Sequence, residues 1–265
     1  MHTTNIFETA FLGLIQGLTE FLPVSSSGHL VIFQDLMGIK EAGLTLDVFL
    51  HTGTLMAVII VFRSDIMRLF KGFLATFTGK EDKFKKTAWL IVLANIPAGL
   101  AGILLKDRIE LLFTSSSYAY FFLIITGVIL FTGKFFKKEK TDLTQITLIT
   151  ALAIGIAQMM AILPGISRSG ITITAAMIMG MKREDAARFS FLLMLPAVAG
   201  ATFLEMMDMA ELGISYIPLA AGFTVSLLSG YAAIKMLMGI IKRYQLHYFA
   251  YYCVIAGTVG LLFLR

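Results

Sequence analysis

Two short polar segments interrupt an otherwise apolar chain, LPVSSSGH at residues 22–29 and LPGISRSG at residues 163–170. Each contains a Leu-Pro pair followed by a serine-rich run, and an apolar stretch comes next. Serine is a favoured helix N-cap, and the free backbone N–H groups at such a helix start are suited to binding phosphate. The two segments therefore predict two helix starts that contribute to a single phosphate-handling site.

Arg168 is the residue whose chemistry is easiest to interpret. Its guanidinium is a planar fork of donors that matches a phosphate group, and the neighbouring hydroxyls add further donors. A positive, donor-rich pocket of this kind would stabilise charge on a phosphoryl group during its transfer. The side chains predicted to bind phosphate are Ser25, Ser27, Ser167, Arg168, Ser169 and Thr172.

Glu20 and Gln16 precede the first segment and lie four residues apart, so on a helix they share one face. A carboxylate there can hold a divalent cation such as Mg²⁺ or Ca²⁺, or accept a proton from a nucleophile. Gln16 is neutral and can only coordinate or hydrogen-bond. We predict both as metal ligands, with the alternative that Glu20 forms an ion pair with Arg168 that merely joins the two segments.

His29 follows Ser26 by three residues, within the first turn of the expected helix. An imidazole there can orient or deprotonate a serine hydroxyl, or protonate a leaving oxygen. A lone serine tract is more typical of capping than of catalysis, but here Glu20 and His29 flank it. The predicted catalytic residues are Glu20, Ser26, His29 and Arg168, and weaker candidates are Asp47, a helix-dipole contact, and His51, either core or supporting.

The elements that must position these residues cross a membrane. Of the 265 residues, 57% are hydrophobic and only 15% are charged, which lies outside the range of soluble domains. The chain is therefore predicted to be an all-α integral membrane protein that forms a single polytopic domain over residues 1–265. Six stretches are long and apolar enough to span the bilayer, at about residues 44–62, 87–105, 118–134, 187–206, 216–238 and 247–264.

Lysine and arginine are concentrated in three of the segments between these stretches. Seven lie in residues 63–86, four in 134–142 and two in 239–246, against two in 106–117 and none in 207–215. The positive-inside rule places the first three segments in the cytoplasm and both termini outside. Because most basic residues act as topology signals in this way, nucleic acid is a poor candidate for a partner.

Residues 5–40 and 143–182 lie outside the six stretches, and each is apolar but broken midway by proline, glycine and serine. At an offset of 142 residues, five positions match: Gly13, Gln16, Ser25, Ser27 and Gly28 pair with Gly155, Gln158, Ser167, Ser169 and Gly170. The alternative is chance similarity between two segments of like composition. We predict two re-entrant helical hairpins added to the six transmembrane helices, in an inverted-topology internal repeat with halves at about 5–134 and 143–264.

The longer segments GLIQGLTEFLPVSSSGHL at 13–30 and LPGISRSGITI at 163–173 resemble the signatures of the undecaprenyl-diphosphate phosphatase family, the bacitracin-resistance proteins. The resemblance covers nearly the whole chain. It implies hydrolysis of undecaprenyl diphosphate to undecaprenyl phosphate and inorganic phosphate at the outer, periplasmic face of the bacterial inner membrane, assisted by a divalent cation. It also implies recycling of the lipid carrier for cell-wall synthesis, and antibiotic resistance.

Carried onto this sequence, the resemblance implies acid, base or metal-positioning roles for Glu20 and His29 and a nucleophilic role for Ser26. It implies phosphate binding by Ser167, Arg168 and Thr172. The expected partners are a polyprenyl diphosphate lipid and the membrane, and a homodimer is left open. The rival function is a transporter or flippase of a phosphorylated polyprenyl lipid, because inverted repeats with broken helices are typical of carriers.

Overall fold

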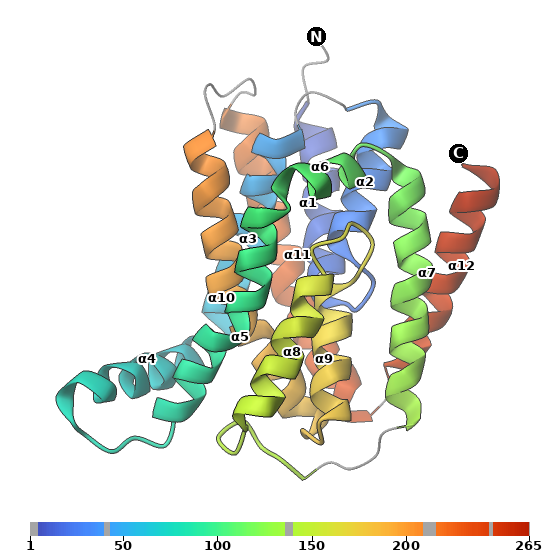
Figure 1. The fold of residues 1–265 in the computed structure, drawn as a ribbon. Helices are drawn as coiled ribbons and strands as arrows, with labels where there is room; N and C mark the ends of the chain where they lie inside the picture. The colour runs from blue at the N-terminus through green and yellow to red at the C-terminus, as the bar shows by residue number, and fades with distance from the viewer. Residues whose placement is uncertain (1–4, 40–42, 136–139, 209–215, 244–245, 265) are drawn as a thin grey trace.

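The computed structural model describes residues 5–39, 43–135, 140–208, 216–243 and 246–264, and over these residues the regular elements are helices (Figure 1). Most of the helices run along one common axis and form a single bundle. Their bounds are α1 (Ile6–Phe21), α2 (Ser26–Met37), α3 (Gly43–Val61), α4 (Arg63–Thr78), α5 (Lys85–Leu104), α6 (Lys106–Phe113), α7 (Ser116–Thr132), α8 (Leu148–Met160), α9 (Arg168–Ile178), α10 (Arg183–Asp208), α11 (Tyr216–Arg243) and α12 (His247–Phe263), with a short 3₁₀ turn at Gly133–Phe135.

Each of the six predicted apolar stretches overlaps one helix, namely α3, α5, α7, α10, α11 and α12. Four helices in the described part of the chain are long and apolar enough to cross a membrane: α5, α7 with its 3₁₀ extension, α10 and α11. The pair α3 and α4 is bent by 83° and adds a fifth span if counted as one, whereas α12 is a shorter apolar helix. The prediction of an all-α membrane protein is confirmed at this level.

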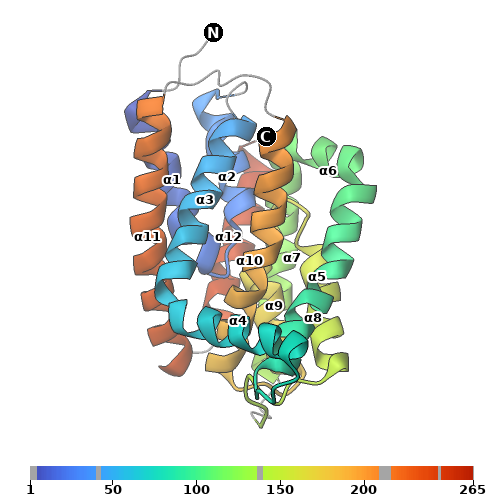
Figure 2. The same cartoon turned by 90° about the vertical axis from the view of Figure 1, so that its left-hand side faces the viewer.

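Helix α4 lies in a segment that the charge pattern predicts as a loop. Its exposed apolar side chains Met67, Phe70, Leu74 and Phe77 recur every three or four residues, so that one face of the helix is apolar. The helix leaves the base of the bundle almost at a right angle to α3 (Figures 1 and 2). This pattern is typical of a helix that lies along a membrane surface, which a search for long apolar stretches overlooks.

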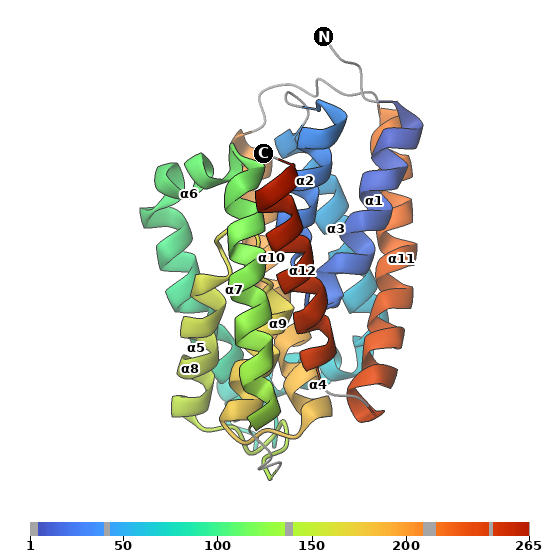
Figure 3. The same ribbon diagram turned by 90° about the vertical axis from the view of Figure 1, so that its right-hand side faces the viewer.

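Within the predicted segments 5–40 and 143–182, of which the first is described up to residue 39, lie two helical hairpins, α1–α2 and α8–α9. Their turns lie in the middle of the bundle (Figures 1 and 3). Helix α1 packs along α11, and α8 packs along α5. A Cβ added to Gly13 would lie 2.4 Å from the carbonyl oxygen of Gly222, and one added to Gly155 would lie 2.4 Å from that of Ala94. The matched glycines thus allow the same close helix approach in both halves.

The turns of the two hairpins also contact each other reciprocally. A Cβ on Gly28 would lie 2.8 Å from the Cα of Gly165, and one on Gly170 would lie 3.3 Å from the Cβ of Pro23. Gly28 and Gly170 are matched at the offset of 142 residues, and so are positions 23 and 165. The same contact therefore occurs twice, and it brings the two serine-rich segments face to face.

The bundle has two chemically different ends. One end of the bundle carries the start of α4, the 3₁₀ turn that follows α7 and the end of α11, all within basic segments (Figure 1). The other end carries the start of α1, the end of α12 and helix α6. This separation agrees with the charge distribution from which the orientation is predicted.

Candidate active site

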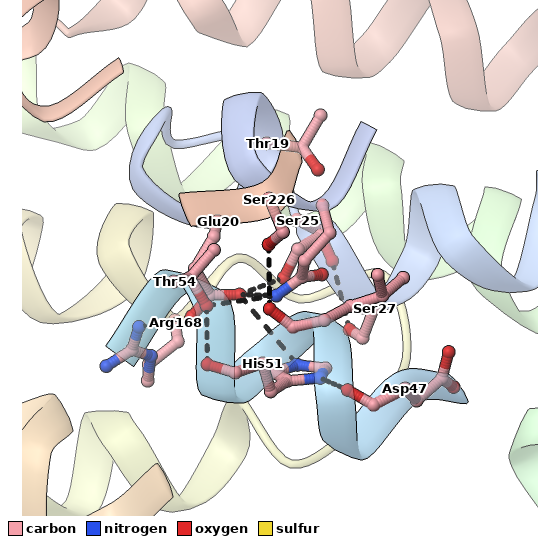
Figure 4. Close-up of polar contacts among 12 residues, drawn as sticks. Thr19, Glu20, Ser25, Ser27, Asp47, His51, Thr54, Arg168 and Ser226 are labelled. Carbon is pink, nitrogen blue, oxygen red and sulfur yellow. Dashed lines mark hydrogen bonds and ion pairs between the residues drawn. The ribbon is translucent and has the colours of Figure 1, made fainter. Parts of the chain in front are cut away.

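Glu20 is the centre of a buried polar cluster where the two hairpin turns meet (Figure 4). Its Oε1 accepts a hydrogen bond from Nη2 of Arg168 at 2.6 Å. Its Oε2 accepts one from Nε2 of Gln16 at 3.0 Å and another from the hydroxyl of Ser26. A buried carboxylate is stable only when it is paired and hydrogen-bonded, and these three partners satisfy both oxygens.

The local structure explains why these side chains converge. Gln16 and Glu20 share one face of the last turns of α1, whereas Ser26 and Arg168 are the first residues of α2 and α9. Ser25 caps α2, because its Oγ accepts from the backbone N–H of Gly28 at 3.2 Å. The helix starts predicted from the two serine runs are therefore confirmed, and both face Glu20.

Ser167 caps α9 in the same way, with its Oγ accepting from the backbone N–H of Gly170 at 3.1 Å. Thr126 on α7 supports this turn from behind, because its hydroxyl donates to the Gly165 carbonyl at 2.8 Å and accepts from the Ser167 N–H at 3.0 Å. Thr126 could not be identified from the sequence, where its only signal is a hydroxyl within an apolar stretch.

Ser25 has an unusual backbone conformation. Its φ is 71°, which makes it the one non-glycine residue with positive φ in the described part of the chain. Such a conformation costs about 1–3 kcal/mol and persists only where surrounding contacts enforce it. The Ser25 carbonyl accepts from both the backbone N–H of His29, at 3.2 Å, and its ring Nδ1, at 2.7 Å. These bonds hold the turn that presents Ser26.

The remaining predicted phosphate ligands have intramolecular partners. Ser169 Oγ donates to the Leu22 carbonyl at 3.3 Å and therefore links the second segment to the first. Thr172 Oγ1 donates to the Arg168 carbonyl at 2.7 Å and lies 2.6 Å from Ser190 Oγ on α10. Ser27 Oγ lies 3.3 Å from Ser25 Oγ. Among the six side chains predicted to bind phosphate, Arg168 is therefore the one that donates a hydrogen bond to Glu20.

Both ring nitrogens of His29 contact groups other than the Ser26 hydroxyl, which the sequence suggests His29 could orient or deprotonate. Its Nδ1 meets the Ser25 carbonyl, and its Nε2 lies 2.7 Å from the hydroxyl of Tyr252 on α12. The Ser26 hydroxyl instead donates to Glu20. In this geometry Glu20 is the carboxylate that could accept the Ser26 proton. Tyr252 is a neighbour of His29 that the sequence did not reveal.

Helix α3 completes the cluster with two side chains, His51 and Thr54 (Figure 4). His51 Nε2 lies 3.9 Å from Glu20 Oε2, and its Nδ1 meets the Asp47 carbonyl at 2.8 Å. Thr54 Oγ1 accepts from Gln16 Nε2 at 3.5 Å. His51 therefore belongs to the site. Thr54 was missed, although it lies seven residues after Asp47 and three after His51 and so shares a helix face with both.

Two buried polar atoms at the site have no hydrogen-bond partner, Gln16 Oε1 and Arg168 Nη1. Leaving such atoms unpaired costs about 1–3 kcal/mol each, so each is a candidate contact for a ligand. Arg168 Nη1 is a donor suited to a phosphate oxygen. Gln16 Oε1 and the carboxylate of Glu20 are the oxygen ligands that Mg²⁺ and Ca²⁺ prefer. They fit a cation that takes its other ligands from phosphate and water.

The described residues contain no group of three or more His, Cys, Asp or Glu side chains that could hold a metal ion by themselves. A cation at Gln16 and Glu20 would therefore depend on ligands supplied by the substrate. This differs from a structural metal site, which the protein alone completes.

Comparisons with known proteins point to one family. The family model described as bacitracin resistance protein BacA matches residues 9–259. A protein of Methanosphaera stadtmanae named undecaprenyl-diphosphatase is 43% identical over 270 residues, covering 97% of this chain and 98% of its own. Proteins of the same name from Halothermothrix orenii and Methanobrevibacter smithii are 44% and 40% identical, and each comparison covers 96% of both chains.

Proposed function

Because the chain belongs to the bacitracin resistance protein BacA family, we infer that it is an undecaprenyl-diphosphatase. It is a membrane hydrolase that converts undecaprenyl diphosphate to undecaprenyl phosphate and inorganic phosphate. The observation that carries this function is the buried pair of Arg168 and Glu20 between two serine-capped helix starts. The proposed physiological roles are recycling of the lipid carrier for peptidoglycan synthesis and resistance to bacitracin.

The reaction begins when a phosphate of the substrate replaces Glu20 as the partner of Arg168. Arg168 holds Glu20 through Nη2, while its Nη1 has no hydrogen-bond partner. The terminal phosphate of the substrate can accept from both nitrogens in the bidentate geometry that guanidinium groups favour. Binding of the substrate therefore releases the Glu20 carboxylate from its cationic partner.

Glu20 then serves as the base. It already accepts the Ser26 hydroxyl hydrogen bond, so it can take that proton as Ser26 Oγ attacks the terminal phosphorus. An Oγ–P bond forms, the bond between that phosphorus and the bridging oxygen breaks, and undecaprenyl phosphate leaves. Water then attacks the phosphorus of the phosphoserine, the Oγ–P bond breaks and inorganic phosphate leaves, and Ser26 Oγ takes its proton back from Glu20. In the alternative route Glu20 deprotonates a water that attacks the same phosphorus directly, and the products are identical.

The backbone N–H groups at the starts of α2 and α9, together with Arg168, stabilise the negative charge that the phosphoryl oxygens carry during transfer. The proposed cofactor is Mg²⁺ or Ca²⁺, held by Gln16 Oε1 and Glu20. When bound, such a cation neutralises part of the charge of the diphosphate. All the side chains in this scheme come from one chain, so the reaction does not require a homodimer.

The proposed topology has six transmembrane helices and two re-entrant hairpins in an inverted repeat, within the bacterial inner membrane. The reciprocal contacts of Gly28 with Gly165 and of Gly170 with Pro23 support a pseudo-twofold relation between the hairpins. The basic end of the bundle would face the cytoplasm. The site would open to the periplasm, as the family resemblance implies. Cysteine labelling of α4 and α6 from either side of sealed vesicles tests this orientation.

The test of the proposed function is phosphate release from undecaprenyl diphosphate by purified protein in detergent. Arg168→Ala is expected to lower turnover at least about 100-fold, because the main phosphate donor is lost. Arg68→Ala is the matched control, since Arg68 is an exposed arginine paired with Asp65 outside the site. Near-normal turnover in Arg168→Ala would contradict the assignment.

A carrier of phosphorylated polyprenyl lipids is the second candidate, favoured by the two broken helix pairs that meet in the middle of the bundle. Phosphate release without a membrane gradient supports the enzyme. Lipid movement across sealed vesicles without hydrolysis would support the carrier instead.

A further inference from the structure

The ring of His29 makes hydrogen bonds at both nitrogens, and their geometry fixes its protonation pattern. Nδ1 lies 2.7 Å from the Ser25 carbonyl oxygen, which can only accept. Nδ1 must therefore carry the proton, and in the neutral ring Nε2 is left as an acceptor. The partner of Nε2 at 2.7 Å is the Tyr252 hydroxyl, which donates to it.

Tyr252 and His29 also pack against each other. Their rings are nearly parallel, with an interplanar angle of 12° and a centroid distance of 5.7 Å. His29 is buried, whereas Tyr252 is 48% exposed on α12, so the tyrosine reaches the histidine from the edge of the bundle. The contact joins two residues that are 223 positions apart in the chain.

Tyr251, the neighbour of Tyr252 in the sequence, has a different environment. Tyr251 is 50% exposed, and its ring packs edge to face on Phe131 of α7 with a centroid distance of 5.0 Å. Tyrosines of this kind are common at membrane interfaces, where they need no further role. The hydrogen bond to a buried residue beside the site distinguishes Tyr252 from them.

A continuous chain of contacts runs from Tyr252 to the proposed nucleophile. The Tyr252 hydroxyl donates a hydrogen bond to Nε2 of His29, and Nδ1 of the same ring donates to the Ser25 carbonyl oxygen. Ser25 is the residue with positive φ, and Ser26 follows it at the start of α2. The strained turn at Ser25 needs surrounding contacts to persist. The hydrogen bonds through His29 supply one such contact, which originates from Tyr252 on the distant helix α12.

We propose that Tyr252 is a positioning residue for the reaction: by donating to His29 Nε2 it holds the Ser25 turn in the conformation that presents Ser26 to Glu20. This inference rests on the proposed function, because it assigns a purpose to the position of Ser26. Arg168 is not part of the chain of contacts. Loss of the tyrosine hydroxyl should therefore lower kcat and leave KM nearly unchanged.

The experiment compares Tyr252→Phe with Tyr251→Phe in the full-length protein in detergent. Tyr252→Phe is expected to lower kcat about three- to tenfold, which corresponds to the loss of one partly buried hydrogen bond. Tyr251→Phe should keep normal kcat. In parallel, ¹⁵N NMR of histidine-labelled protein without substrate reports on His29 Nε2, with the resonance assigned from a His29→Gln variant.

The NMR measurement detects the contact independently of catalysis. In Tyr252→Phe the Nε2 resonance should move toward the value of an acceptor that lacks a hydrogen bond, and in Tyr251→Phe it should stay in place. An unchanged resonance, or an unchanged kcat, in Tyr252→Phe overturns the inference while the proposed function stands. A wild-type protein that releases no phosphate from undecaprenyl diphosphate overturns both.

Discussion

The ion pair between Glu20 and Arg168 is expected to matter for both stability and chemistry, and the two contributions can be separated. The side chains are 5% and 14% exposed, and the charged atoms lie 2.6 Å apart. Removing one partner of such a buried pair costs about 3–5 kcal/mol, since the other charge is left uncompensated. Glu20→Gln should therefore lower the thermal midpoint by about 10 °C or more.

The double variant Glu20→Gln/Arg168→Gln removes both charges and leaves no uncompensated ion. We expect it to recover most of the stability that Glu20→Gln loses, since neutral replacement of a buried pair is often nearly neutral in free energy. Its activity should stay at least about 100-fold below wild type, because the base and the phosphate donor are both absent.

The assays are thermal unfolding in detergent and phosphate release from undecaprenyl diphosphate. Glu184→Gln is the matched control, since Glu184 pairs with Arg188 at 2.7 Å, where both side chains are 35% exposed, and with the more exposed Lys242 at 3.3 Å. Such a pair contributes at most about 1 kcal/mol, and its loss should not affect turnover. If the double variant recovered activity together with stability, the pair would be only a structural link between the hairpins and the mechanism would be refuted.

Three further outcomes are expected from the same assays. Ser26→Ala should lower kcat at least about 100-fold, whereas full activity would leave water as the nucleophile. Gly28→Ala places a Cβ 2.8 Å from the Cα of Gly165, so it should lower the free energy of unfolding by about 1–3 kcal/mol and reduce turnover. The control Gly99→Ala, whose Cβ would have no atom within 4 Å, should change neither quantity. A chelator should abolish phosphate release, and Mg²⁺ or Ca²⁺ should restore it; activity unaffected by chelator would remove the cation from the scheme.

The apolar helices and the two helix starts could be predicted from the sequence, because both depend on local composition. A span requires about 20 apolar residues, and a serine cap requires only a backbone N–H a few residues later. Helix α4 was missed because its apolar residues occupy one face, so its mean composition resembles that of a polar loop. Predictions from composition therefore succeed for elements that are apolar all round and fail for helices that are apolar on one face.

Side-chain direction within the site could not be read from spacing. His29 is three residues after Ser26, yet its ring points to the Ser25 carbonyl and to Tyr252 from a helix far along the chain. Thr172 likewise bonds back to the carbonyl of Arg168, a common behaviour of threonine in helices. Both outcomes depend on the competition between local backbone acceptors and distant partners, which tertiary packing decides.

The two copies of the hairpin differ at the positions that form the candidate site. The position that matches Glu20 at the offset of 142 residues is Ile162, so the second copy has no carboxylate to act as a base. Gln158, which matches Gln16, donates instead to Asn95 at 2.9 Å. At the same offset, the position that matches Ser26 is occupied by Arg168. Because the hairpin turns meet face to face, this substitution places the guanidinium of one copy against the carboxylate of the other, and each copy then supplies a group that its partner lacks.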